Sequence, residues 1–298
     1  MPDAAVIPRT VAFCGLGMLG GRVCDALVAS PHRIAVYDPR AEALDTPVAA
    51  GARRATSPAD AATDADVLIV FVRDDAQAVD VVTGPQGMLR TARPGSVVVL
   101  HATVAPATVR EVHAACGTAG VGFVDAGIST GAGRPVGDFF VMCGGDPALI
   151  DAVRPVLAVY ASDIVRFGDV GAGMTAKLIR NAVRYSMYGA LYEGLALAEA
   201  AGIDLTAMVH LYRGTFAHSE EDDVILDRPT MVPLAPDDPE ADAATVAFRT
   251  MITTLGWKDL DGAEALAVEL GGDLPVARAA RMLLGPAFGI ALHGEVRP

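Results

Sequence analysis

Short apolar runs alternate with helical patterns through the first half of the chain. The apolar runs predict strands at 11–14, 34–37, 67–72, 97–100, 122–124, 139–143 and 164–167. Helical patterns lie between them, at 21–29, 77–82, 108–116 and 147–160. Strands that alternate with helices are typical of an α/β fold with a mainly parallel, doubly wound sheet.

The strand pattern stops near residue 170, and only helical patterns follow. One long helix is predicted over 172–200, with further helices at 205–212, 241–254, 259–270 and 275–288. Residues 219–242 carry acidic residues and prolines with little periodicity, so we expect an irregular segment there. The sequence therefore predicts an α/β domain over residues 1–168 and an all-helical domain over residues 169–298.

A glycine-rich turn follows the first predicted strand and reads Gly15-Leu16-Gly17-Met18-Leu19-Gly20. Gly15 permits the tight turn, Gly17 lets the backbone approach a pyrophosphate, and Gly20 lets a helix pack closely on the strand. The N–H groups at the start of that helix favour phosphate. We interpret the turn as the fingerprint of a Rossmann-type dinucleotide-binding domain. The alternative is a glycine-rich turn in an α/β domain that binds no nucleotide.

The acid at the end of the second predicted strand bears on the choice of nucleotide. Asp38 stands where a carboxylate can accept hydrogen bonds from the ribose hydroxyls, and it would repel a 2′-phosphate. Arg40 lies two residues further on and could soften that preference. We therefore expect NAD as the cofactor and leave NADP open.

Composition narrows the class of protein. The chain has 298 residues, 52% of them hydrophobic, and a formal net charge of −13. Such a charge argues against nucleic acid and anionic membranes as partners. The longest apolar run, Val67 to Val72, is too short to span a bilayer, and no secretory signal is visible. Four cysteines lack metal-ligand spacing, so we expect a cytoplasmic protein with reduced thiols and no metal.

A lysine and an amide stand at the start of the long predicted helix. Lys177 and Asn181 are four residues apart, so they project from one helical face, and Gly171 and Gly173 precede them. An amine beside an amide can exchange a proton with a substrate and orient it. Taken alone, the pair could equally be an ordinary helix start.

Taken together, the motifs resemble those of the β-hydroxyacid dehydrogenase family, which includes 3-hydroxyisobutyrate and 6-phosphogluconate dehydrogenases. Besides the glycine-rich turn, the resemblance rests on His101-Ala102-Thr103-Val104-Ala105-Pro106, Asp125-Ala126-Gly127-Ile128-Ser129-Thr130-Gly131, the Gly173 to Asn181 segment and Trp257-Lys258-Asp259-Leu260. Their order and spacing cover nearly the whole chain.

The resemblance implies roles at matching positions. Lys177 matches the catalytic lysine that exchanges the hydroxyl proton, and Asn181 matches the amide that orients the substrate. Ser129, Thr130 and Gly131 match the loop that holds the substrate carboxylate. Each has a plain alternative, namely a solvated lysine, a surface amide or a simple turn.

The resemblance also implies cofactor contacts beyond the glycine-rich turn. Val72 and Arg73 follow the third predicted strand, Thr103 would lie by the nicotinamide, and Lys258 would reach the cofactor or substrate from the helical domain. A structural threonine and a surface lysine are the alternatives for the last two.

Several arginines depart from the family pattern around the expected substrate pocket. Arg73, Arg134, Arg180 and Arg184 suggest an anionic substrate, unless they pair with surface acids. Arg184 and Tyr185 fall in a segment similar to that of 6-phosphogluconate dehydrogenases, where an acid stands in place of Arg184. There the resemblance implies that Tyr185 contacts the substrate, with a packed helix aromatic as the alternative. A guanidinium cannot donate a proton at neutral pH, so we expect no decarboxylating reaction.

The sequence thus predicts an oxidoreductase that transfers a hydride between NAD and the hydroxyl carbon of a small 3-hydroxy carboxylic acid. One alternative is an NADPH-dependent reductase of aldehyde acids or an imine reductase-like enzyme; imine reductases usually lack the lysine. A second is a nucleotide-binding protein without catalysis. The resemblance also implies a homodimer or homotetramer formed through the helical domain.

Overall fold

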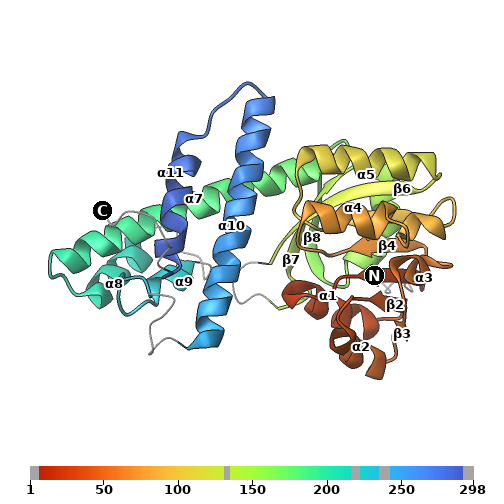
Figure 1. The fold of residues 1–298 in the computed structure, drawn as a ribbon, viewed down its shortest axis with the longest axis horizontal. Helices are drawn as coiled ribbons and strands as arrows, with labels where there is room; N and C mark the ends of the chain where they lie inside the picture. The colour runs from red at the N-terminus through yellow and green to blue at the C-terminus, as the bar shows by residue number, and fades with distance from the viewer. Residues whose placement is uncertain (1–6, 131–134, 216–221, 235–241, 291–298) are drawn as a thin grey trace, which may run out of the picture. The chain divides into compact units, whose positions relative to one another are not determined.

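The computed structural model describes residues 7–130, 135–215, 222–234 and 242–290, and these form two compact units (Figure 1). Unit 1 holds the described residues up to Lys177, and unit 2 holds those from Leu178 onward. The division falls inside one long helix, α7 (Ala172–Ala200), which therefore contributes to both units. We still propose that the nucleotide-binding domain ends at residue 168.

The described part of unit 1 contains one eight-stranded sheet in the order β3-β2-β1-β4-β5-β6-β7-β8. Its strands are β1 (Thr10–Cys14), β2 (Arg33–Tyr37), β3 (Arg53–Arg54), β4 (Val67–Val70), β5 (Val97–Leu100), β6 (Gly122–Ser129), β7 (Phe139–Gly144) and β8 (Ala161–Gly168). All neighbours are parallel except β6 and β7, which are antiparallel. The predicted doubly wound α/β fold is confirmed.

Helices line both faces of this sheet because its strands bury alternate residues on opposite sides. Val11 and Phe13 of β1 belong to one apolar core, whereas Ala12 and Cys14 belong to the other. The longer helices of unit 1 are α1 (Met18–Val28), α4 (Asp75–Thr83), α5 (Pro106–Thr118) and α6 (Pro147–Leu157). Helices α1 and α6 pack on the first core, and α4 and α5 pack on the second.

The strand order reverses at β1, which pairs with β2 on one side and with β4 on the other. In open α/β sheets, ligands bind beyond the carboxyl ends of the strands at such a switch point. The turn after β1 and the segment after β4 therefore flank the expected nucleotide site.

Some elements of unit 1 differ from the sequence-based expectation. The sequence pattern missed β3, the short helices α2 (Asp45–Ala49) and α3 (Pro58–Ala62), and the 3₁₀ turns η1 (Ala41–Leu44) and η2 (Met88–Arg90). These elements are too short to show a hydrophobic period. Strand β4 ends two residues earlier than predicted, and β6 extends to Ser129 because β7 pairs along its second half.

The described residues of unit 2 form helices joined by loops and contain no β-strand longer than an isolated bridge, in agreement with the predicted all-helical domain. Besides α7 it contains α8 (Leu205–Thr215), α9 (Asp223–Leu226), α10 (Ala243–Glu269) and α11 (Pro275–Ala287). The prediction of two helices over 241–254 and 259–270 is wrong, since α10 runs through both. Gly256 does not end the helix; a Cβ there would lie 2.4 Å from Leu284 of α11, so the glycine permits close helix packing.

The segment predicted to be irregular is described only in part. Within 222–234, it contains helix α9 and a single bridge between Leu234 and Ile290. Among the described helices, none is long and apolar enough to cross a membrane.

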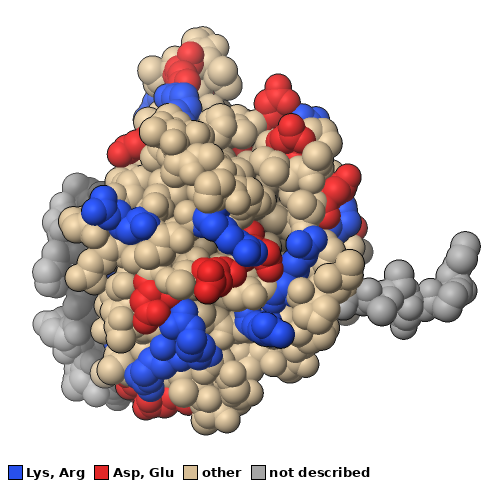
Figure 2. Space-filling view, turned by 90° about the vertical axis from the view of Figure 1, so that its right-hand side faces the viewer, with Lys and Arg blue, Asp and Glu red and all other residues tan. Residues whose placement is uncertain are grey.

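Charged side chains of both signs lie interspersed on the face of the molecule shown in Figure 2. Several exposed arginines pair with nearby aspartates, as in Arg53–Asp60 and Arg54–Asp45. Such pairs contribute little stability, but they neutralise basic charge locally.

Candidate active site

The glycine-rich turn after β1 has the shape that a dinucleotide needs. Gly15 has φ +103°, and a Cβ on it would lie 2.2 Å from the Phe71 carbonyl oxygen. A Cβ on Gly20 would lie 2.2 Å from the Gly15 carbonyl oxygen. Around Gly17, by contrast, no described residue other than its chain neighbours and its own helix backbone comes within 4 Å of an added Cβ. Gly15 and Gly20 thus allow close backbone contacts within the turn, and Gly17 leaves its backbone accessible to a ligand.

The other residues of the turn divide between core and solvent. Leu16 is buried and Leu19 packs against the core, whereas Met18 is 64% exposed. Gly17 precedes α1 and offers no side-chain cap, so the first amides of α1 lack the usual side-chain acceptor. This uncapped, positive helix end suits a pyrophosphate. The residues present therefore fit NAD or NADP.

Asp38 lies at the end of β2, directly against the turn. Its Oδ2 accepts a hydrogen bond from the Leu16 N–H at 2.8 Å, and its Oδ1 accepts one from the Arg40 N–H at 3.0 Å. Burial tends to raise the pKa of Asp38, but hydrogen bonds from Arg40 and Leu16 outweigh it and hold the pKa below its ordinary value. Asp38 is therefore ionised at neutral pH.

The segments after β4 and β5 form the other side of the switch point. Val72 packs near the turn, since a Cβ on Gly15 would lie 3.3 Å from its side chain. Arg73 is exposed, and its N–H donates to the Gln77 side chain. Asp75 accepts hydrogen bonds from the Ala105 N–H and the Thr108 hydroxyl. Asp75 thereby ties the segment after β4 to the segment that follows Thr103.

His101, which opens the second motif, is a buried framework residue that sequence analysis did not single out. Its Nδ1 lies 2.6 Å from the Ala126 carbonyl oxygen, and its Nε2 lies 2.7 Å from the Tyr160 hydroxyl. Burial lowers the pKa of His101 to about 4, so the ring is neutral. A carbonyl can only accept, so we assign the proton to Nδ1 and let the Tyr160 hydroxyl donate to Nε2.

The first turn of α7 is fixed on β6 and β7 by close backbone contacts. Asp125 of β6 is buried and accepts from the N–H groups of Gly171 and Met174, each at 2.7 Å. A Cβ on Gly173 would lie 2.3 Å from the Met142 carbonyl oxygen, and one on Gly127 would lie 2.6 Å from the Cβ of Lys177. The glycines therefore let Lys177 sit directly over β6.

The predicted carboxylate-binding residues continue from the same strand. Ser129 is the last residue of β6, two positions beyond Gly127, and Thr130 follows it; both are half-buried. Gly131 and Arg134 lie outside the described residues. The structure thus places Ser129, Thr130 and Lys177 on neighbouring parts of unit 1.

In unit 2, Asn181 belongs to a buried polar network. Its Nδ2 donates to Asp259 Oδ2 at 2.7 Å, and its Oδ1 accepts from Arg180 at 3.1 Å. Lys258 Nζ lies 3.2 Å from Asp259 Oδ1, at ion-pair distance but without hydrogen-bond geometry. The amide of Asn181 is thus held on both sides, and Asp259 is a residue whose part in the site sequence analysis missed.

The remaining predicted substrate contacts of unit 2 have protein partners. The Tyr185 hydroxyl lies 3.5 Å from Asp259 Oδ2, and burial, followed by the nearby Asp259 charge, raises the pKa of Tyr185 above its ordinary value. Arg184 donates to the buried Asp222 at 2.5 Å and lies over the Tyr188 ring. Arg180 and Tyr185 therefore join the Asn181 network, whereas Arg184 has Asp222 as a partner.

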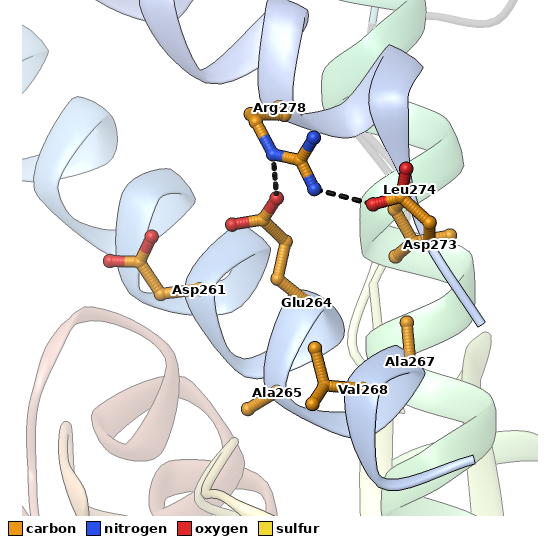
Figure 3. A pocket seen from close by; sticks show the side chains of 8 residues that line it. All are labelled: Asp261, Glu264, Ala265, Ala267, Val268, Asp273, Leu274 and Arg278. Carbon is orange, nitrogen blue, oxygen red and sulfur yellow. Dashed lines mark hydrogen bonds and ion pairs between the residues drawn. The ribbon is translucent and has the colours of Figure 1, made fainter. Parts of the chain in front are cut away.

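A pocket between α10 and α11 contains none of the predicted site residues (Figure 3). It is lined by Asp261, Glu264, Ala265, Ala267, Val268, Asp273, Leu274 and Arg278. Arg278 pairs with both Glu264 and Asp273, so these charges are already matched within the protein.

Two family models match the chain in succession. Residues 10–169 match the NAD binding domain of 6-phosphogluconate dehydrogenase, and residues 171–289 match the NAD-binding domain of NADP-dependent 3-hydroxyisobutyrate dehydrogenase. The chain therefore belongs to the β-hydroxyacid dehydrogenase family, and it is an NAD(P)-dependent dehydrogenase that acts on hydroxy acids.

Individual relatives agree with this assignment. An uncharacterised oxidoreductase of Mycobacterium tuberculosis is 33% identical over 295 residues, which cover 98% of this chain and 96% of that protein. An NAD-dependent L-serine dehydrogenase of Pseudomonas aeruginosa is 31% identical over 206 residues, 69% of each protein. The structure of M. tuberculosis 3-hydroxyisobutyrate dehydrogenase with L-serine matches with a TM-score of 0.76 and 26% identity, covering 94% of this chain and 93% of that one.

Proposed function

We propose that the protein oxidises the hydroxyl group of a small 3-hydroxy carboxylic acid, with Lys177 as the general base and NAD as the cofactor. The main support for this proposal is where lysine occurs along the chain. Of the 23 Lys and Arg residues, only Lys177 and Lys258 are lysines, and both fall in motifs of the site. Arginine serves for surface charge, but it cannot lose its proton near neutral pH, whereas an amine can.

The substrate class follows from the residues beside Lys177. Ser129 and the backbone of Thr130 would hold a carboxylate, while Asn181 would orient the hydroxyl-bearing carbon. The relatives support a 3-hydroxy acid, because both L-serine and 3-hydroxyisobutyrate carry a hydroxyl on the carbon next but one to the carboxylate.

The reaction divides its work among these residues. The glycine-rich turn, Asp38, Arg40, Val72, Arg73, Thr103 and Lys258 would hold the cofactor, and NAD, when bound, accepts the hydride from the hydroxyl carbon. Lys177, as the free amine, takes the hydroxyl proton, so the C–O bond becomes a carbonyl. In the reverse direction the ammonium of Lys177 returns that proton to the carbonyl oxygen. Asn181 fixes the oxygen against Lys177.

The decisive experiment compares Lys177→Ala with the unchanged enzyme on L-serine and 3-hydroxyisobutyrate, in the presence of NAD. We expect kcat to fall about 10³-fold, because general acid–base catalysis contributes roughly 10²–10⁴-fold. The Kd for NADH should stay within about twofold, since the cofactor contacts are untouched. Unchanged turnover would rule out the mechanism, and an absence of turnover in the unchanged enzyme with all 3-hydroxy acids would favour the nucleotide-binding alternative.

The reductase alternatives are separated by their cofactor and substrate. An NADPH-dependent reductase of aldehyde acids would turn over with NADPH and show little oxidation with NAD. An imine reductase would reduce cyclic imines, and it would need no lysine at position 177. Release of carbon dioxide from 6-phosphogluconate would contradict our expectation for Arg184.

We also propose that the protein forms a homodimer or homotetramer through unit 2. Ile179, Val183, Met187 and Leu197 of α7 are 38–72% exposed, and the first three are spaced by four residues along one helix face. Light scattering should show a larger assembly, and Val183→Glu should reduce its mass. Val276→Glu, at an exposed apolar position of α11, is the matched control.

A further inference from the structure

Helices α4 and α5 begin at the same edge of the sheet, because the strands before them, β4 and β5, are parallel neighbours. The start of α4 is fixed by its own sequence. Asp74 accepts a hydrogen bond from the Gln77 N–H at 2.9 Å, and the Gln77 side chain accepts one from the Arg73 N–H at 3.2 Å. Helix α5 has Ala105 as its N-cap residue, and an alanine side chain offers no acceptor.

The acceptor at the start of α5 comes from α4. Asp75 Oδ1 accepts the Ala105 N–H at 2.8 Å and the Thr108 hydroxyl at 2.6 Å. In a capping box, the third residue of the helix supplies the acceptor for the N-cap N–H. In α5 that third residue is the buried Thr108, which donates to Asp75 instead. One carboxylate oxygen thus ties the start of α5 to the start of α4.

This link joins the two segments that we expect to lie beside the nicotinamide. Val72 and Arg73 come just before Asp75, and Thr103 comes two residues before Ala105. Both segments leave the sheet at its carboxyl edge, where the strand order reverses. The position of one segment therefore depends on the other through Asp75.

We propose that Asp75 is a positioning residue for the nicotinamide half of the cofactor. It holds the Thr103 segment in place beforehand, so that binding does not have to order it. The adenosine half depends on other contacts, since the glycine-rich turn is bonded to β2 through the Gly15 N–H and the Tyr37 carbonyl oxygen at 3.0 Å. The inference rests on the cofactor contacts proposed above, but it involves neither Lys177 nor the hydroxy acid.

The test compares NADH with ADP-ribose, which has the adenosine and the pyrophosphate but no nicotinamide. Both Kd values are measured by titration calorimetry on the full chain, without substrate. In Asp75→Ala we expect NADH to bind about tenfold more weakly and ADP-ribose to stay within about twofold, because two hydrogen bonds to a charged group are lost on the nicotinamide side alone. Equal weakening of both ligands, or unchanged binding of NADH, overturns the proposal.

Two further variants test whether the acceptor oxygen is the cause. Asp75→Asn keeps an oxygen that can accept from both donors, so its Kd for NADH should stay within about twofold of that of the unchanged protein. Thr108→Val removes one of the two donors and should weaken NADH about threefold, with ADP-ribose unchanged. Binding of NADH as weak in Asp75→Asn as in Asp75→Ala overturns the proposal.

Asp146→Ala is the matched control for loss of a carboxylate at a helix start. Asp146 caps α6 of the same unit and accepts from the Ala148 N–H at 2.7 Å. Because α6 follows β7, which runs antiparallel to β6, this helix begins at the opposite edge of the sheet. We expect Asp146→Ala to lose stability without a change in either Kd, and weaker binding of NADH alone in this variant overturns the proposal.

Thr103→Ala separates failure of this proposal from failure of the proposed cofactor contacts. If Thr103→Ala weakens NADH but Asp75→Ala does not, the role of Asp75 is wrong and the cofactor contacts stand. If neither variant weakens NADH, both are wrong. Turnover is not measured, so the result for Lys177→Ala leaves this test unchanged.

Discussion

Two successive turns of helix α7 carry the two residues of the proposed catalytic pair, and they are held in different ways. Lys177 lies over β6 because Gly127 and Gly173 let backbones meet and Asp125 anchors the helix start. Asn181, one turn later, is held by the side chains of Asp259 and Arg180. Backbone packing tolerates no added atom, whereas a side-chain network can adjust. The residue that we propose to transfer the proton thus has the rigid support, and the residue that we propose to orient the substrate has the adaptable one.

The strongest test of this contrast adds one methyl group under Lys177. Gly173→Ala places a Cβ 2.3 Å from the Met142 carbonyl oxygen, so α7 must shift on the sheet. Overpacking typically costs about 1–3 kcal/mol, and a clash with backbone lies at the upper end, about 3 kcal/mol. We expect urea denaturation to show this loss and kcat to fall with it.

The control for that change is Gly117→Ala in α5, where an added Cβ would have no neighbour within 4 Å in the described part of the chain beyond its own helix. This variant should be unchanged or slightly more stable, because alanine favours a helix over glycine. Equal stability of Gly173→Ala and Gly117→Ala would remove the contrast between the two turns.

Stability measured as a function of pH tests whether unit 1 requires the buried His101 to be neutral. The pKa of His101 is about 4 in the folded protein and 6.5 ordinarily. The unfolded chain therefore binds a proton that the folded chain refuses, so His101 contributes stability above pH 6.5 that is lost as the pH falls toward 4. The loss is about 3 kcal/mol at 1.36 kcal/mol per unit.

The measurement is the free energy of unfolding at several pH values between 4 and 7. His101→Asn should be less stable at neutral pH but should show a shallower fall with acid than the unchanged protein. Parallel curves for the two proteins would show that His101 does not control the acid response.

Asp125→Asn tests the anchor of α7 itself. An amide can accept one N–H bond but turns its NH₂ group toward the other backbone N–H, where Asp125 accepts from both Gly171 and Met174. We expect a loss of about 2 kcal/mol in stability, the range for hydrogen bonds to a charged group, and a lower kcat with little change in the Kd for NADH. Full activity at full stability would mean that the glycines alone fix Lys177.

Substitutions of Asp259 should lower kcat the least among these changes, and by an amount that depends on the new side chain. Asp259→Ala removes the acceptor of the Asn181 Nδ2, and we expect kcat to fall about tenfold while KM changes less. Asp259→Asn can still accept through its amide oxygen, so it should recover most of that loss. A purely structural role for Asp259 is indicated if both variants lose stability and kcat equally.

Much of the fold was predictable because it is local. The bounds of α7 match the predicted 172–200, since its composition favours a helix over its full length. Strand alternation likewise gave the α/β order. The exception in unit 2 is α10, for which the pattern predicted two helices with a gap at 255–258. Gly256 lies in that gap, and it is explained by contact with Leu284 of another helix, which the local pattern does not contain.

The sequence predicted those site residues that we expect to contact the cofactor or substrate directly, but it did not predict the residues that support them. Asp125, Asp259 and His101 stand in the quoted motifs, but their contacts were not predicted because the partners lie far along the chain, as in Asn181–Asp259 and Tyr160–His101. Spacing along the sequence cannot reveal such contacts. One available signal was overlooked, namely that lysine occurs at only two positions.

That sparing use of lysine gives the chain an unusual digestion map. A lysine-specific protease has only two places to cut, after Lys177 in α7 and after Lys258 in α10. Both bonds are inside helices, so cleavage requires local opening of the segment concerned. The rates of cleavage after the two lysines therefore measure separately how often each helix opens. A bound molecule that stabilises α7 or α10 will slow cleavage in that helix.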